Sequence, residues 1–257
     1  MLFVKYLYAL LSGLLSGGAL GMTGGGGSIL AVPMLVYVVG ENIHLAIGTS
    51  LIAVGITSLI SSASYMKQSL VKFKIAFLMA SPGIVSTYLG ALINRQIKGP
   101  VLLLAFALLM IYIGYLMVKQ KREEKVIGHS GRSIRYGKIL LLGFITGFAS
   151  GFFGIGGGFL LVPALYLGAN LNMKQAIATS LFIIFLFGLF GFLSYEIQGR
   201  HIDLAISAVF VAGGAVGGFV GAFIAKRTDQ NLLRKIFSVF IILIGLAVFV
   251  ENLLKVL

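Results

Sequence analysis

Residues 24–33, Gly24-Gly25-Gly26-Gly27-Ser28-Ile29-Leu30-Ala31-Val32-Pro33, place four consecutive glycines inside a long apolar stretch. A similar stretch follows 130 residues later as Gly154-Ile155-Gly156-Gly157-Gly158-Phe159-Leu160-Leu161-Val162-Pro163. Each glycine disfavours a helix by about 1 kcal/mol relative to alanine and frees the backbone to turn. We therefore expect a helix that breaks at each glycine run and restarts near Ser28 and near Gly158.

The same offset of 130 aligns residues far outside the glycine runs. Gly13, Gly17 and Gly21 align with Gly143, Gly147 and Gly151, and Asn42, Thr49-Ser50-Leu51 and Ser64-Tyr65 align with Asn172, Thr179-Ser180-Leu181 and Ser194-Tyr195. Composition alone could align some glycines, but not these polar residues in one register. Self-similarity at a fixed offset indicates a duplicated unit. The sequence therefore predicts two homologous transmembrane repeats, residues 1–118 and 138–257, joined by a basic linker at 119–137.

Composition indicates that the chain lies in a membrane. Hydrophobic residues make up 59% of the chain and charged residues 11%, and the mean hydropathy is +1.06. Such a chain has too little polar surface to cover a water-soluble globule. Its uncharged runs are long enough to cross a hydrocarbon core of about 30 Å as helices, and they lack the alternation of barrel strands. We expect an all-α polytopic membrane protein of about eight apolar segments, near 3–40, 45–65, 75–94, 100–118, 138–169, 176–195, 204–225 and 232–250.

The positive charges predict the topology of the chain. Most of the net charge of +13 lies in short connections, where anionic lipid and topology control explain it better than nucleic acid does. The linker should face the cytoplasm, because the stretch from Lys119 to Lys138 carries seven Lys or Arg residues against Glu123 and Glu124. If the first and fifth segments each cross once, the repeats are parallel; if each forms a broken hairpin, the repeats are inverted. The charge pattern favours inversion, which places the connection around Lys226 and Arg227 inside.

The broken helices suggest how the protein binds an anion. A helix that restarts after a glycine run presents its positive N-terminal end and free amides, and interrupted helices build the substrate sites of many transporters. The following Thr-Ser pairs could cap helices, bond back to the helix, or donate to a bound oxyanion. The candidate substrate-binding residues are Gly24, Gly25, Gly26, Gly27, Ser28, Thr49, Ser50, Gly154, Gly156, Gly157, Gly158, Thr179 and Ser180, with Pro33 and Pro163 as helix-break or hinge positions. Glycines spaced by four, such as Gly13 and Gly17, are expected to allow close helix packing instead.

Ionisable residues are expected to lie outside the apolar segments. All seven acidic residues map to connections or segment ends, which argues against a carboxylate proton relay through the midplane. His44, His129 and His201 are scattered in connections, so we expect solvated loop histidines and no metal site. The sequence has no cysteine and no combination of nucleophile, base and acid at membrane depth, so it predicts no enzyme and no cofactor.

Hydroxyl residues are distributed unequally between the two halves. The segment after Thr49 carries a group of hydroxyls that its counterpart, residues 181–193, almost entirely lacks. The group comprises Thr57, Ser58, Ser61, Ser62 and Ser64. Any polar path through the protein is therefore expected to be asymmetric.

The doubled pattern resembles a known family. Gly154 to Pro163 followed by Ala178-Thr179-Ser180-Leu181, and Gly24 to Pro33 followed by Gly48-Thr49-Ser50-Leu51, look like the sulfite exporter TauE/SafE family across both halves of the chain. The resemblance implies a bacterial or archaeal cytoplasmic-membrane permease with about seven to eight spans. Family members are associated with sulfite, sulfoacetate, other sulfonates and small organic anions. Met22-Thr23 departs from the aromatic pair at Phe152-Phe153.

These observations predict a secondary transporter for a small anion. The two repeats would work by alternating access in a multi-pass cytoplasmic-membrane protein, surrounded by lipid, with no nucleic-acid partner. A proton is one candidate coupling ion. Two alternatives remain open: an anion channel, which would conduct without saturation or exchange, and a non-transporting membrane subunit.

Overall fold

The fold is a bundle of helices, seen in a computed structural model that describes residues 2–119, 136–169, 171–227 and 230–256. No strand occurs in these ranges. The helices are α1 (Leu2–Thr23), α2 (Ser28–Pro33), the π-helix η1 (Met34–Val38), α3 (Ile43–Met66), α4 (Phe73–Asn94), α5 (Gly99–Lys119), α6 (Tyr136–Phe153), α7 (Gly158–Gly168), α8 (Met173–Ile197), α9 (Leu204–Arg227) and α10 (Gln230–Val256).

The bundle has the length and the surface of a membrane protein. Seven helices among the described residues are long and apolar enough to cross a bilayer. Large apolar side chains also cover the outside of the bundle; Phe219 of α9 is 73% exposed and Phe77 of α4 is 56% exposed. A surface this apolar is stable in hydrocarbon rather than in water. The predicted class, an all-α polytopic membrane protein, is confirmed.

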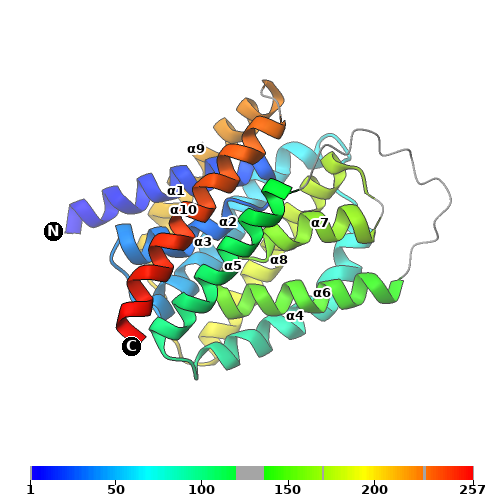
Figure 1. Ribbon diagram of the computed structural model, residues 1–257. Coiled ribbons are helices and arrows are strands. Elements are labelled where there is room, and N and C mark those ends of the chain that lie inside the picture. Colours follow the sequence, from blue (N-terminus) through cyan, green and yellow to red (C-terminus); the bar gives the residue numbers. More distant parts are fainter. Residues whose placement is uncertain (1, 120–135, 170, 228–229, 257) are drawn as a thin grey trace.

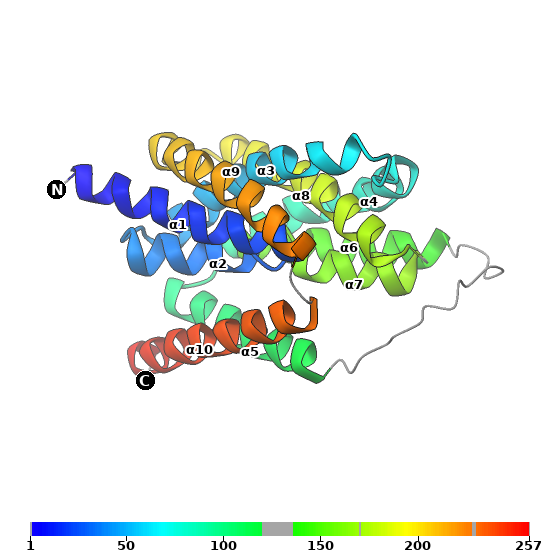
Figure 2. The same ribbon diagram turned by 90° about the horizontal axis from the view of Figure 1, so that it is seen from above.

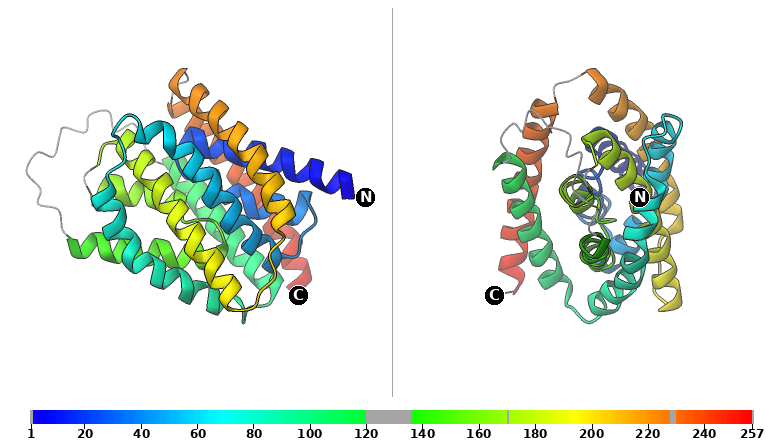
Figure 3. Two further views of the ribbon diagram at one scale, coloured as in Figure 1. Left: turned by 180° about the vertical axis from the view of Figure 1, so that it is seen from behind. Right: turned by 90° about the vertical axis from the view of Figure 1, so that its right-hand side faces the viewer.

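The first segment of each half is broken at its glycine run, as predicted. α1 ends at Thr23 and α2 restarts at Ser28, while α6 ends at Phe153 and α7 restarts at Gly158. The restarted helix folds back beside the first, because Ser16 Oγ in α1 donates to Gly27 O over 2.7 Å. α1 with α2, and α6 with α7, therefore form two hairpins. Figures 1 and 3 show α1 and α6 entering the bundle from opposite ends.

Glycine stripes hold these hairpins against the rest of the bundle. α1 packs chiefly on α9 and α6 chiefly on α4. A Cβ added at Gly17 would overlap the backbone of Gly214, and one added at Gly147 would overlap the backbone of Gly83. Glycines at these positions let two backbones approach within direct contact, which is how small residues drive helix association in lipid. The packing role expected for the glycines spaced by four is thus observed.

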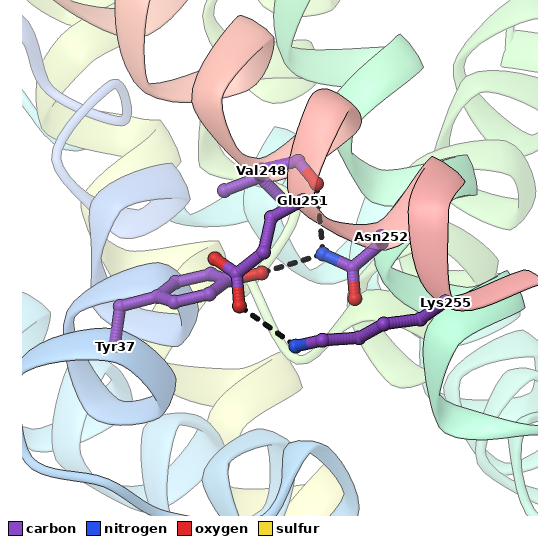
Figure 4. Close-up of polar contacts among 5 residues, drawn as sticks. All are labelled: Tyr37, Val248, Glu251, Asn252 and Lys255. Carbon is purple, nitrogen blue, oxygen red and sulfur yellow. Dashed lines mark hydrogen bonds and ion pairs between the residues drawn. The ribbon is translucent and has the colours of Figure 1, made fainter.

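The remaining helices complete a layered arrangement. α3 packs on α8, and α5 packs on α10 (Figure 2). The end of α10 also reaches the first hairpin, because Asn252 Nδ2 donates to Tyr37 Oη in η1 over 2.6 Å and to Val248 O over 2.7 Å (Figure 4). Nearby, Lys255 Nζ lies 2.7 Å from Glu251 Oε1 on the outer face of α10.

Helices that correspond at the sequence offset of 130 make equivalent packing contacts. α6 is the counterpart of α1 and α9 the counterpart of α4, so the two hairpin contacts, α1 with α9 and α6 with α4, are equivalent. Any two-fold relation between the halves gives this exchange, and the entry of α1 and α6 from opposite ends is the arrangement that inverted repeats would give (Figure 1). The division into repeats 1–118 and 138–257 stays a prediction, and most of the linker at 119–137 lies outside the described residues.

The glycine stripes predict a steep dependence of stability on side-chain size. Gly17→Val and Gly147→Val should each lower the free energy of unfolding by about 1–3 kcal/mol or prevent folding, because the added atoms overlap backbone that cannot yield. Gly137→Ala in the first turn of α6 is the control, since a Cβ there meets nothing within 4 Å. The measurement is thermal unfolding in detergent. Equal melting temperatures for all three variants would contradict the packing role.

Candidate anion site at two converging glycine turns

The two glycine turns, residues 24–27 and 154–157, meet inside the bundle. A Cβ added at Gly25 would overlap the carbonyl of Gly158, and one added at Gly158 would lie 2.8 Å from Gly25 Cα. Both turns are buried. Backbone contact of this kind is possible only where neither residue carries a side chain. The structure therefore brings together the two glycine runs that lie 130 residues apart in the sequence.

The turns differ in backbone conformation. Gly154, Gly156 and Gly157 have φ angles of 71°, 63° and 67°, in the left-handed region that glycine adopts without strain. In the first turn only Gly24 has a positive φ, of 73°, and Gly27 is in the right-handed helical region with φ −64°. The second turn consequently depends on glycine at three positions for its conformation. Leucine at Gly157 would be strained there and would also approach Thr146 O.

One serine from the other half of the chain holds each turn. Ser50 Oγ in α3 lies 2.6 Å from Gly154 O, and Ser180 Oγ in α8 lies 2.7 Å from Gly24 O. Each hydroxyl also lies within 2.9 Å of a carbonyl in its own helix, that of Ile47 or Ile177. A hydroxyl has a single proton to donate. Ser50 and Ser180 therefore direct their protons to protein carbonyls and position the turns.

The Thr-Ser pairs are not helix caps. The N-cap residues of α3 and α8 are Asn42 and Asn172, whose side chains accept from the backbone amides of His44 and Gln175 over 3.0 and 2.9 Å. The capping alternative is wrong because both helices begin about two turns earlier than these pairs. Asparagine is among the strongest N-cap residues, so the aligned Asn42 and Asn172 already indicate in the sequence where the two helices begin.

The two threonines have different surroundings. Thr179 Oγ1 accepts from the amide of Lys72 over 3.0 Å. Thr49 Oγ1 is buried and has no hydrogen-bond partner among the described residues. Both threonines are completely buried. Of the five predicted hydroxyls, Thr49 alone has no hydrogen-bond partner among the described residues.

The two restarted helices also differ at their first amides. In α2, the amides of Ser28, Ile29 and Leu30 donate to the carbonyls of Gly25, Gly26 and Gly27 over 3.1–3.3 Å. The Ser28 hydroxyl likewise donates to Gly25 O over 2.7 Å. The start of α2 is thus closed by its own turn, through residues 25–30.

α7 begins with unpaired amides. Its first amide bonds are those of Leu160 and Leu161, which both donate to Gly157 O over 3.0 Å. Gly158 and Phe159 have no described acceptor for their amides in the portion of the chain that the structure covers. Unpaired amides at a helix start, together with the helix dipole, favour a negative group. The start of α7 is therefore the more suitable anion cradle of the two.

The prolines lie beyond the turns and not in them. Pro33 is the last residue of α2, where the chain continues as the π-helix η1. Pro163 lies inside α7, which continues to Gly168. The helix break is therefore made by the glycines, and the hinge role of the prolines stays a prediction.

A cationic cluster that the sequence analysis did not identify lies near the second turn. The Arg200 guanidinium carbon lies 3.8 Å from the centre of the Tyr195 ring. Its Nη2 donates to Asn94 Oδ1 over 3.0 Å and lies 3.2 Å from His44 Nδ1, and its Nη1 donates to Ala91 O over 3.3 Å. Within the described part of the chain, no carboxylate lies within 4.0 Å of this half-buried cation.

The cluster is connected to the second glycine turn. Asn94 Oδ1 also accepts from Tyr195 Oη over 3.3 Å, while Asn94 Nδ2 donates to Phe152 O over 2.7 Å, two residues before Gly154. His44 lies in the first turn of α3 within this cluster, so its prediction as a solvated loop residue is wrong. The sequence does contain one sign of this cluster. Arg200, five positions after Tyr195, aligns with Leu70 in the first half, so the basic residue is specific to the second half.

A helical bundle with two broken hairpins that meet at glycine turns has the architecture of a membrane transporter. Comparison with known sequences agrees, and the chain belongs to the sulfite exporter TauE/SafE family, whose model matches residues 9–248. It is 39% identical to a "Probable membrane transporter protein" of Xylella fastidiosa (strain Temecula1), over 92% of each chain. It is 30% identical to the "Probable membrane transporter protein YunE" of Bacillus subtilis, over 97% of this chain and 99% of that one. No solved structure matches the chain.

The serine bonds predict how firmly the turns are held. Ser50→Ala and Ser180→Ala should each lower the free energy of unfolding by about 1–3 kcal/mol, because each leaves a buried turn carbonyl without its donor. Ser62→Ala is the matched control, since the buried Ser62 hydroxyl bonds only back to Leu59 O in its own helix. Thermal unfolding in detergent measures the effect. A loss at Ser62 as large as the losses at Ser50 and Ser180 would show that the bonds to the turns are unimportant.

Proposed function

We propose that the protein is a secondary transporter that carries a small anion across the cytoplasmic membrane by alternating access of its two halves. The substrate we propose is sulfite, sulfoacetate, another organosulfonate or a related organic anion. The observation that carries the proposal is the convergence of the two glycine turns inside the bundle, because transporters place their substrate sites where interrupted helices meet. Membership of a transporter family favours transport over catalysis, and that the chain is not an enzyme stays a prediction.

The anion would bind to backbone rather than to charged side chains at the turns. The unpaired amides of Gly158 and Phe159 and the positive end of α7 are the strongest candidates. Gly24–Gly27 and Gly154–Gly157 would shape the site, and Ser50 and Ser180 would fix its walls rather than contact the substrate. Neutral donors suit a carrier, because a site that binds too tightly would not release its anion.

Arg200 would draw anions to one mouth of the site. A half-buried guanidinium with no carboxylate partner is energetically costly, and a bound oxyanion would supply the missing charge. Asn94 links Arg200 to the carbonyl that precedes the second turn. An anion held at Arg200 would therefore lie next to the turn that presents the free amides.

The positive charges support one orientation. The connection between α8 and α9, which contains Arg200, and both chain ends lie at one end of the bundle, and α5 ends and α6 begins at the opposite end (Figure 1). The linker between α5 and α6 carries much of the positive charge of the chain, so we expect its end to face the cytoplasm. Arg200 would then face outward.

Flux measurements on the purified protein in proteoliposomes test the proposal. Labelled sulfite, sulfoacetate and acetate should enter with saturable kinetics, and unlabelled substrate inside should accelerate entry by exchange. Saturation and exchange follow from a site that is exposed to one side at a time. Flux that rises linearly with concentration and shows no exchange would identify an anion channel, and no flux of any of these anions would favour a non-transporting subunit.

Arg200 gives a specific expectation for anion capture. Arg200→Gln should raise the KM for the transported anion about tenfold or more with a smaller effect on kcat, because it removes a charge-assisted contact at the mouth. Lys98→Gln is the control, an exposed cation at the same end of the bundle. An unchanged KM in Arg200→Gln, with Lys98→Gln also unchanged, would exclude anion capture by Arg200.

A further inference from the structure

Glu41 is a buried acid that makes no ion pair within the described residues. It lies in the short connection between η1 and α3, and only 4% of its surface is exposed. Neither carboxylate oxygen has a hydrogen-bond partner among the described residues. A charged carboxylate in such a place is costly unless it is paired, so the neutral, protonated form is favoured. The sequence correctly places Glu41 in a connection but gives no sign that it is buried.

The groups that face Glu41 come from three elements. Thr49 of α3 offers a hydroxyl, Lys5 of α1 a positive charge, and Asp203, just before α9, a negative charge. Lys5 Nζ lies 4.0 Å from Asp203 Oδ2, so its charge is shared with a second carboxylate. Burial raises the pKa of Glu41 to about 7 and Asp203 adds to the rise, while the Thr49 hydroxyl and Lys5 oppose it. Glu41 therefore changes charge near neutral pH.

A broken line of unpaired hydroxyls follows Glu41 along α3, first at Thr49 and then, about two turns further on, at Thr57, Ser58 and Ser61. After Thr49, the buried hydroxyls of Thr57, Ser58 and Ser61 also have no hydrogen-bond partner among the described residues. The line faces α9, because Ser207 contacts Thr49 O, Thr57 lies against Gly214 and Ser61 lies against Gly218. Buried polar atoms without protein partners are the sites where ordered water binds.

The second half of the chain lacks this line. At the offset of 130, Glu41 corresponds to Leu171, Thr57 to Phe187, Ser58 to Gly188 and Ser61 to Gly191. Leu171 and Phe187 are buried members of the apolar core. Since the counterpart helix α8 folds and packs without these polar groups, the fold does not require them. A function specific to the first half is the remaining reason for several uncompensated polar groups in one line.

We propose that Glu41 is the proton-binding group that couples the transporter to a proton gradient, and that the hydroxyl line from Thr49 to Ser61 guides the proton along α3. The inference rests on the proposed transport function and names its coupling ion. The carboxylate takes up a proton from the side where Arg200 captures the anion, so one negative charge is neutralised as another enters. The neutral carboxyl then releases the proton through hydroxyls and water when the site faces the other side.

Proteoliposome flux with and without an inward proton gradient tests the coupling. The gradient should accelerate anion uptake by the unmodified protein severalfold, whereas Glu41→Gln should keep exchange at equal pH and lose the response to the gradient. Glu196→Gln, an exposed acid at the same end, should respond like the unmodified protein. A normal gradient response in Glu41→Gln, or none in the unmodified protein, would overturn the proposal while leaving anion transport established by the exchange measurement.

Two further measurements test the proton path and the carboxyl separately. The first does not need Glu41→Gln to fold, and the second does not need the transported anion to be known. Thr57→Val should slow gradient-driven uptake, while Ser62→Ala should not, because the Ser62 hydroxyl is bonded within its own helix. Infrared spectra of the protein in lipid should show a buried carboxyl band that titrates near neutral pH and disappears in Glu41→Gln. A carboxyl band that titrates only at acidic pH would overturn the assignment without any transport assay.

The raised pKa also predicts how stability depends on pH. In the unfolded chain Glu41 loses its proton near pH 4.5, whereas in the folded protein it does so at about 7. The folded state therefore loses stability as the pH rises from about 4.5 to about 7. Glu41→Gln should raise the melting temperature in detergent at pH 8 by several degrees more than at pH 5. An equal change at both pH values would contradict the burial of a titrating acid.

Discussion

The contact between Gly25 and Gly158 is the constraint on which the rest of the structure depends. Two broken helices can meet backbone to backbone only if both turns lack side chains at the point of contact. The meeting leaves buried carbonyls, which would be costly in a membrane without donors. Ser50 and Ser180 supply these donors from α3 and α8, so two helices that pack on each other hold the turns.

The glycine stripes extend the same principle to the scaffold. Each hairpin begins in a helix, α1 or α6, whose glycines contact the backbone of α9 or α4. Hydrocarbon offers no hydrophobic drive for helices to associate, so close backbone packing and interhelical hydrogen bonds must do it. The turns are thus fixed at one end by packing and at the other by serine hydroxyls. A conformational change that opens the site would have to move each hairpin as a unit with its packing partner.

The sequence could predict where helices break and which segments span the membrane, but not the contacts made across the fold. The glycine runs located the restarts at Ser28 and Gly158, because helix breaking is a local property of the chain. The pairing of Ser50 with Gly154 depends on how α3 meets the other hairpin, which no local pattern encodes. Arg200 and Glu41 were overlooked for the same reason. Both lie in connections, and only the packing shows that one lacks a counter-charge and the other is buried.

The asymmetry between aligned halves separates scaffold from function. Positions that keep the same chemistry at the offset of 130, such as Ser50 and Ser180, form the equivalent bonds that build the two turns. Positions that differ, such as Glu41 against Leu171 and Arg200 against Leu70, carry the ionisable groups, and both ionisable groups lie at the same end of the bundle. A fold made of two similar halves needs only the shared positions to be stable. A carrier that moves an anion in a preferred direction must break that equivalence. Arg200 to bind the anion and Glu41 to bind the proton, both at one end of the bundle, would make the two ends chemically different enough to do so.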